Sequence, residues 1–176
     1  MNRYGTLIDD NTLEFRRLLP GPIERVWSFI VDPEKRARWL AGGETDPKVG
    51  GTMELNFKNS ELSPKQDEAP GESCKDMPDC VPTKGVITQF NPPHLFGFTW
   101  LGEKADTEVR ISLEQQGEKV LLTLIHSRLV IQDERLGIMA GWHTHLNIFE
   151  DVLGDQIPEG FWKQHNALEK EYEAML

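Results

Sequence analysis

The chain has 176 residues, of which 38% are hydrophobic and 27% charged, a balance typical of one soluble globular domain with a sizeable core. Its formal net charge of −10 and its lack of a long basic run argue against nucleic acid and anionic membranes as partners. No apolar run is long enough to span a bilayer, and the first residues lack a signal-peptide pattern, so we expect a cytoplasmic protein.

The first part of the chain predicts one strand followed by two short helices. Apolar and polar residues alternate over residues 12–19, as in a strand with one buried face, and a Pro-Gly-Pro turn at residues 20–22 ends it. The apolar positions then follow helical spacing, with a proline in the first turn. Asp32 caps a second, shorter helix, and Trp39 lies near its end.

Several later segments predict an antiparallel meander. They alternate apolar and polar residues and are separated by turn residues: residues 52–58, 85–90, 95–100, 107–114 and 119–127. Residues 59–84 interrupt this pattern with four of the eleven prolines, six acidic residues and both cysteines. We expect an extended acidic, Pro-rich loop there.

The last part of the chain predicts a long amphipathic helix. Helical spacing returns at about Ile138 and continues to Leu153, where Gly154 supplies a stop. Residues 155–176 form a C-terminal extension with a further helix. A one-sided sheet that curls around one helix often packs incompletely against it, so this order of elements predicts a pocket.

Short motifs along the chain resemble one known family. The stretch LEFRRLLPGPIERVW occupies residues 13–27, and GWHTHL occupies residues 141–146. Between them lie further matching motifs: DPE at 32–34, Trp39, VGG at 49–51, Gly85-Val86, PPHL at 92–95, FTW at 98–100 and LTLIHS at 122–127. Together they cover residues 4–154 and resemble the AHSA1 branch of the SRPBCC superfamily, which is named for the activator of Hsp90 ATPase.

The resemblance implies an α+β helix-grip fold, also called Bet v 1/START-like. In that fold a curved antiparallel β-sheet wraps around a long C-terminal α-helix, and two short helices follow the first strand. We therefore interpret residues 1–176 as a single SRPBCC/AHSA1-like domain. The loop at residues 59–84 is longer than the connection usual in the family, and residues 155–176 extend past the minimal fold.

Large apolar side chains predict the wall of the pocket. The alternation places three strand residues and two helix residues on its inner face: Phe57, Phe98, Trp100, Met139 and Trp142. Ordinary core packing accounts for any one of them, and only the set favours binding. Trp39 either gates the entrance or clasps a helix to the sheet.

Two histidines are candidates for polar contacts in the pocket. His126 lies on the inner face of its strand and His145 on the covering face of the helix, so the two imidazoles are candidates to orient a ligand or to shuttle protons. The alternative is that each is a buried histidine bonded to a neighbouring backbone group.

His143 and His145 point to different sides of a helix, and Cys74 and Cys80 do not match zinc-ligand spacing. We therefore expect no metal and no cofactor.

Three functions remain open from the sequence. The first is binding of a small hydrophobic or aromatic ligand, lipid-like or polyketide-like, without chemical change. The second is a cyclase or dehydratase that uses His126 and His145 as acid–base groups. The third, implied by the resemblance, is an Hsp90 co-chaperone-like module with a role in the stress response. Signatures of common nucleotide, hydrolase and protease chemistry are missing, so binding is preferred over catalysis. Monomer and homodimer stay open.

Overall fold

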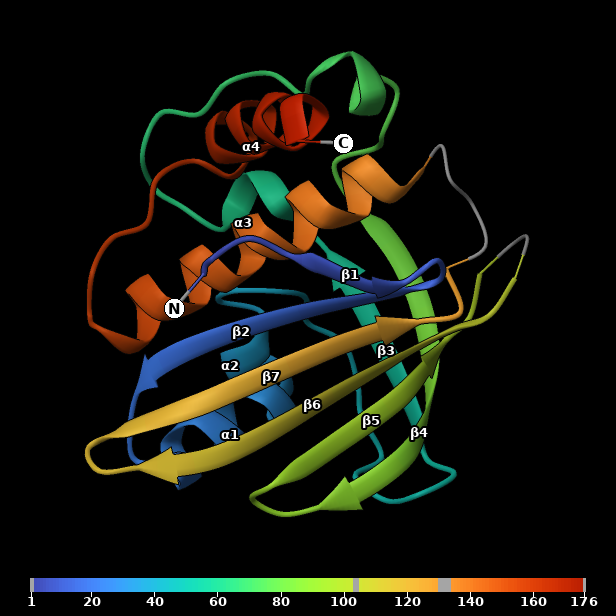
Figure 1. Ribbon diagram of the computed structural model, residues 1–176, viewed down its shortest axis with the longest axis vertical. Coiled ribbons are helices and arrows are strands. Elements are labelled where there is room, and N and C mark those ends of the chain that lie inside the picture. Colours follow the sequence, from blue (N-terminus) through green and yellow to red (C-terminus); the bar gives the residue numbers. More distant parts are fainter. Residues whose placement is uncertain (1, 103–104, 130–133, 176) are drawn as a thin grey trace.

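The computed structural model describes residues 2–102, 105–129 and 134–175. Seven antiparallel strands of this part of the chain form one curved sheet in the order β1-β2-β7-β6-β5-β4-β3 (Figure 1). The strands are β1 (Thr6–Asp9), β2 (Thr12–Pro20), β3 (Thr52–Phe57), β4 (Val81–Asn91), β5 (Leu95–Trp100), β6 (Thr107–Gln116) and β7 (Lys119–Ser127). The helices are α1 (Ile23–Val31), α2 (Pro33–Arg36), α3 (Arg135–Leu153) and α4 (Phe161–Met175), with short 3-10 turns η1 (Asn59–Glu61) and η2 (Glu72–Cys74).

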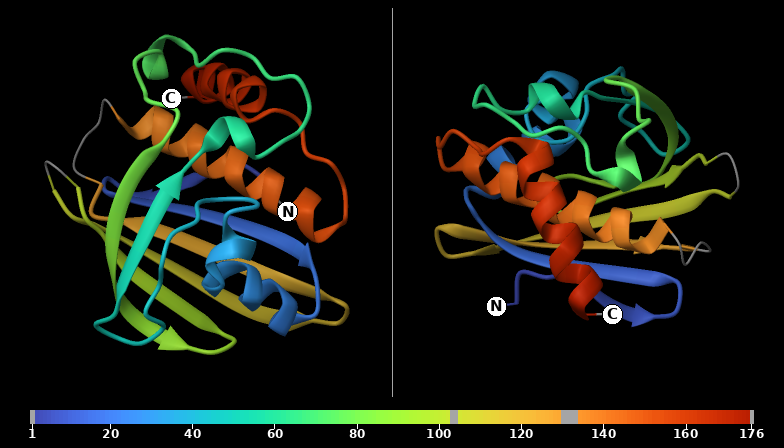
Figure 2. Two further views of the ribbon diagram at one scale, coloured as in Figure 1. Left: turned by 180° about the vertical axis from the view of Figure 1, so that it is seen from behind. Right: turned by 90° about the horizontal axis from the view of Figure 1, so that it is seen from above.

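The core lies on the concave face of the sheet. Phe15 on β2 is fully buried there and pairs in register with the equally buried Leu124 on β7. Helix α3 lies across this face, and α1 and α2 lie on the same side of the sheet nearer its other end (Figure 2). The predicted helix-grip arrangement is therefore confirmed. No helix of the described residues is long and apolar enough to cross a membrane.

The two short helices begin at the predicted turn residues. Pro22 immediately precedes α1 in extended conformation. The Asp32 carboxylate accepts hydrogen bonds from the backbone N–H groups of Glu34 at 2.9 Å and Lys35 at 3.2 Å. This side-chain cap satisfies donors that the first turn of α2 leaves unpaired, and it explains why the chain turns sharply between α1 and α2.

Two stretches of strand lie outside those predicted. Strand β1 pairs with the edge of β2 although its own residues carry no apolar alternation. Strand β4 begins at Val81, so the end of the predicted loop at residues 59–84 belongs to the sheet. Pairing with β3 orders it, with Phe57 opposite Val81. This pairing is non-local. In the sequence Pro82 argues against a strand here, because proline cannot donate a backbone hydrogen bond to a neighbouring strand.

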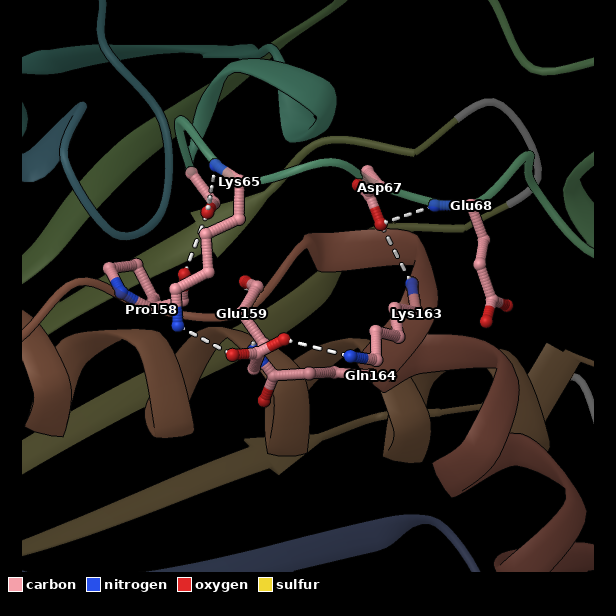
Figure 3. A network of polar contacts seen from close by, with 8 residues as sticks. Lys65, Asp67, Glu68, Pro158, Glu159, Lys163 and Gln164 are labelled. Carbon is pink, nitrogen blue, oxygen red and sulfur yellow. Dashed lines mark hydrogen bonds and ion pairs between the residues drawn. The ribbon is translucent and has the colours of Figure 1, made fainter.

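The remaining part of that loop packs on α4. The Asp67 carboxylate accepts a hydrogen bond from the backbone N–H of Lys163 at 2.9 Å (Figure 3). It accepts a second one from the backbone N–H of Trp162 at 3.1 Å. The Ser63 hydroxyl donates to the carbonyl oxygen of Pro158 at 2.7 Å. A side chain from a distant loop therefore caps the N-terminus of α4.

An ion-pair network reinforces this contact. The Glu159 carboxylate lies 2.5 Å from the ammonium group of Lys65 and 2.9 Å from that of Lys163 (Figure 3). Hydrogen bonds from these two lysines lower the pKa of Glu159 to about 2. We call this unit, residues 63–67 with residues 158–163, the loop–helix clasp.

Candidate ligand-binding cavity

A cavity of about 710 Å³ lies between the sheet, α3, α4 and the end of the long loop. Its volume is within the range of small-molecule sites in proteins. Its lining residues come from five parts of the chain: Leu40, Phe57 and Asn59; Ser73, Cys74, Met77, Val81 and Thr83; Trp100, Gly102, Ala105, Thr107, His126 and Leu129; Glu134, Leu136, Gly137, Ile138, Gly141, Trp142 and His145; Phe161, Trp162, His165 and Glu169.

Nearly parallel rings form the sheet side of the cavity. The ring centroids of Phe57 and Trp100 are 5.5 Å apart and those of Trp100 and His126 are 5.8 Å apart, with interplanar angles of 6° in both pairs. These three residues come from β3, β5 and β7, which alternate in the sheet. Trp142 on α3 stands edge-on to Trp100 at 6.0 Å and 88°. The three rings therefore form an offset stack beside the cavity, and Trp142 stands edge-on to its central ring.

Helix α4 supplies a second aromatic wall, which the sequence analysis did not assign to the pocket. The ring of Phe161 lies 4.9 Å from that of His145 on α3, and it stacks on His165 at 5.6 Å. Trp162 meets Phe161 edge-on at 4.9 Å. The residues following the long helix are thus part of the cavity and bring a third histidine to it.

Two glycines on α3 keep part of the cavity empty. Gly137 and Gly141 both line it, and a Cβ atom placed on either would meet no other atom within 4 Å. Four residues apart, they share one face of the helix. A helix with glycine in its interior is less stable than one with alanine there by roughly 0.5–1 kcal/mol. The two glycines therefore lower the stability of α3 and leave open space in the cavity.

His126 is fixed in one tautomer by its neighbours. The indole N–H of Trp142 donates to Nδ1 of His126 at 3.0 Å, and Nε2 of His126 lies 2.8 Å from the Thr107 hydroxyl oxygen. Because an indole nitrogen only donates, Nδ1 carries no proton, and the proton of the neutral ring is on Nε2. Burial lowers the pKa of His126 to about 4. Both ring nitrogens are therefore engaged in a neutral imidazole.

His145 is fixed in the opposite tautomer. Its Nδ1 lies 2.8 Å from the backbone carbonyl oxygen of Trp39, which only accepts, so Nδ1 carries the proton. Burial lowers the pKa of His145 to about 4, although the bond to Trp39 opposes the shift. The ring lines the cavity, and its Nε2 therefore offers a lone pair there.

His165 contributes a further unpaired nitrogen. Its side chain is 97% buried by area, at 3% exposure, and its Nδ1 has no hydrogen-bond partner among the described residues. Burial lowers the pKa of His165, while the negative charge of Glu169 and a hydrogen bond to the Gly137 backbone oppose this shift. The cavity therefore holds three neutral histidines at pH 7.

The structure brings together five of the eight residues predicted for the pocket. Those that line the cavity are Phe57, Trp100, His126, Trp142 and His145. Phe98 is instead buried in the core between Phe96 and Trp100. Met139 is also buried away from the lining, because one residue along a helix turns the side chain by about 100° and the adjacent Ile138 faces the cavity.

Trp39 lies in the core and not at the entrance. It is fully buried, stacks on Phe149 of α3 at 4.0 Å and 10°, and donates from its indole N–H to the Phe29 carbonyl oxygen at 2.8 Å. These contacts join the segment after α2 to helices α3 and α1, and they leave no ring at the surface to act as a gate. Its backbone carbonyl still shapes the site, because it orients His145.

The cysteines lie in different environments. Cys74 is half-buried and lines the cavity, whereas Cys80 is exposed, and both are free thiols. In the ranges that the structure describes, no group of three or more His, Cys, Asp or Glu side chains is arranged to hold a metal ion.

Comparison with known proteins identifies the family. A family model described as Activator of Hsp90 ATPase homolog 1-like protein, AHSA1, matches residues 20–154. The chain belongs to the AHSA1 family. The predicted resemblance to the AHSA1 branch is therefore confirmed.

Solved structures share the AHSA1 fold of this chain. The solution structure of the protein encoded by BPP1335 from Bordetella parapertussis is 37% identical, with a TM-score of 0.80 over 99% of this chain and 91% of that one. CalU16 from Micromonospora echinospora is 21% identical, with a TM-score of 0.65 over 93% of this chain and 87% of that one. DynU16 is 18% identical, with a TM-score of 0.66 over 85% of this chain and 49% of that one. No curated protein matches the chain.

Proposed function

We propose that this AHSA1 protein binds a small hydrophobic or aromatic molecule, lipid-like or polyketide-like, in the cavity between the sheet, α3 and α4. The observation that carries the proposal is a cavity of about 710 Å³ walled by aromatic rings on two sides and kept open by Gly137 and Gly141. Flat rings favour a planar ligand, because parallel or edge-on stacking adds to the burial of apolar area.

The charges of the lining residues favour an uncharged ligand over an anionic one. None of the described lining residues is a lysine or an arginine, whereas Glu134 and Glu169 are acidic. The histidines are neutral at pH 7 because burial lowers their pKa values. A carboxylate or phosphate buried here would lose its hydration and gain no cationic partner from these residues.

One structural relative supports a small molecule as the ligand. DynU16 is described as a protein in the dynemicin biosynthetic locus. At 18% identity the likeness extends only to the fold. It supports the proposal because the same fold is encoded at a locus of small-molecule biosynthesis.

A cavity-filling variant tests the proposal. In equilibrium dialysis against a panel of uncharged aromatic compounds, the protein should bind several, and Gly141→Phe should bind them at least tenfold more weakly because its ring occupies the cavity. Gly141→Ala, which adds one methyl group, is the matched control and should lie between the two. A protein that binds none of the panel, or a Gly141→Phe variant that binds as well as the parent, would contradict the proposal.

Acid–base catalysis of the cyclase or dehydratase type is a second candidate. The observation that favours it is the lone pair that Nε2 of His145 offers to the cavity. His126 is less suited to the role of base, because both of its nitrogens are engaged. For any compound that the protein converts, His145→Gln should reduce turnover at least 100-fold while the Kd changes little. Unchanged turnover would remove this candidate.

Contact with an Hsp90-type chaperone is supported by the family description alone. It stays a prediction, as do the cytoplasmic location and the choice between monomer and homodimer. A pull-down with the host's Hsp90 homologue followed by an ATPase assay tests the chaperone contact directly.

A further inference from the structure

Thr107 places a hydroxyl group on the aromatic wall of the cavity. It is the first residue of β6 and pairs in register with Trp100 of β5. Trp100 is the central ring of the parallel row that joins Phe57 and His126. Thr107 also lines the cavity, so its hydroxyl lies beside this ring stack where an aromatic ligand would be held.

The hydrogen-bond chain that reaches Thr107 has only one consistent direction. The Trp142 indole N–H donates to Nδ1 of His126, so the Nε2–H of His126 donates to the Thr107 oxygen. A hydroxyl group has one proton to donate. Because His126 already acts as a donor toward it, Thr107 directs that proton elsewhere, and no described residue accepts it. Residues on α3, β7 and β6 thus combine to make Thr107 a hydrogen-bond donor.

We propose that Thr107 determines ligand specificity by donating a hydrogen bond to a carbonyl oxygen on an uncharged aromatic ligand. The inference rests on the proposed binding function and narrows it to aromatic ketones and related carbonyl compounds. Trp142 and His126 are positioning residues, since they act on the ligand's oxygen only through the direction they impose on the Thr107 hydroxyl. The carbonyl carbon takes no part in bond formation.

Two probes of matched shape isolate this hydrogen bond. In 2-acetylnaphthalene the side group carries C=O, and in 2-isopropenylnaphthalene the same position carries C=CH₂. The ratio of their Kd values, measured by equilibrium dialysis, cancels the stacking and the apolar burial that the two probes share. A hydrogen bond contributes about 1 kcal/mol, so the protein should bind the ketone roughly 5- to 10-fold more tightly than the alkene.

Three variants distinguish a directed hydroxyl from general packing. Thr107→Val keeps the shape and removes the hydroxyl, so the Kd ratio should fall to about one. Thr107→Ser retains the hydroxyl and should retain the preference. Trp142→Phe removes the indole N–H, which allows His126 to protonate at Nδ1 and accept from Thr107 at Nε2. This variant should also lose most of the preference, whereas a purely structural role would weaken both probes equally.

The possible results separate the two proposals. Tight binding of both probes with a ratio near one, or a ratio unchanged in Thr107→Val, would overturn the role of Thr107 and leave the binding function in place. Failure of the parent protein to bind either probe would overturn the role of Thr107, and failure to bind any compound of the aromatic panel would overturn the binding function as well. If Trp142→Phe keeps the preference for the ketone, Thr107 remains the donor, but His126 and Trp142 do not set the direction of its hydroxyl.

Discussion

Gly141 shows at the scale of one residue how the molecule exchanges stability for an open cavity. Alanine at this position of α3 would favour the helix, and there is room for its Cβ atom. The motif was recognised in the sequence, but the reason for its glycine was not. Whether a helix glycine borders open space or a close neighbour depends on the residues around it, which the sequence does not show. Gly137 and Gly141 could therefore not be assigned to the cavity from the sequence alone.

Gly141→Ala should therefore stabilise the protein. We expect the free energy of unfolding in urea to rise by roughly 0.5–1 kcal/mol, because alanine favours the helix and its methyl group meets open space. The m-value should stay unchanged. A loss of stability would show that the space beside Gly141 is occupied.

The buried histidines make stability depend on pH. Burial lowers the pKa of His126 and His145 to about 4 and is the main cause that lowers that of His143 to about 3; the pKa of His165 is also lowered. Each folded-state pKa lies below the unfolded value near 6.5, so the unfolded chain binds more protons as the pH falls through 6.5. Stability is therefore fully present above pH 6.5 and is lost progressively toward pH 4.

Urea unfolding at pH 7 and pH 5 measures this effect. We expect the free energy of unfolding to be lower at pH 5 by on the order of 1–2 kcal/mol for each of His126, His143 and His145. In His145→Gln the free energy of unfolding should differ less between pH 7 and pH 5 than in the parent protein, since the substitution removes one titrating group. Equal stability at both pH values would show that these histidines bind protons in the folded state as readily as in the unfolded chain.

At the scale of elements, α4 is the part of the site that depends most on distant contacts. Its apolar residues predicted a helix, but no local pattern indicated where that helix packs. Its position depends on the loop–helix clasp, in which Asp67 caps α4 from across the fold. The strands and α3 were predictable because their apolar periodicity is local. The start of β4 is instead ordered by pairing with β3, and β1 pairs with its neighbour β2 without an apolar alternation of its own.

Removing the cap should loosen α4. Asp67→Ala leaves two N–H groups of the first turn without their acceptor and should lower the free energy of unfolding by about 1–2 kcal/mol. Ligand affinity should also fall, because α4 carries Phe161, Trp162 and His165. Hydrogen exchange of the α4 amides should accelerate more than that of α3.

Lys65→Ala is the matched control for the clasp. It breaks an exposed ion pair with Glu159, and exposed pairs contribute about 0–1 kcal/mol. An effect of Lys65→Ala as large as that of Asp67→Ala would indicate that charge, and not the helix cap, holds α4 on the loop.

At the scale of the whole molecule, the cavity combines the shared AHSA1 fold with segments at its margins. The family model ends at residue 154, before α4 begins. Yet Phe161, Trp162, His165 and Glu169 of α4 line the cavity, as do Cys74 and Met77 of the long loop. The sheet and α3 supply one side of the cavity. The long loop, which lies within the matched range, and α4, which lies beyond it, supply residues on the other side. Ligand preference is therefore expected to differ among relatives whose loops and C-terminal segments differ.

The five tryptophans allow a direct measurement of where a ligand binds. Trp100, Trp142 and Trp162 line the cavity, whereas Trp27 packs against Phe90 and Phe96 in the core and Trp39 stacks on Phe149. In a ¹H–¹⁵N correlation spectrum, titration with 2-acetylnaphthalene should move the indole N–H signals of the first three and leave those of Trp27 and Trp39 nearly in place. Saturation without movement of the cavity signals, or with the largest changes at Trp27 and Trp39, would contradict ligand binding in this cavity.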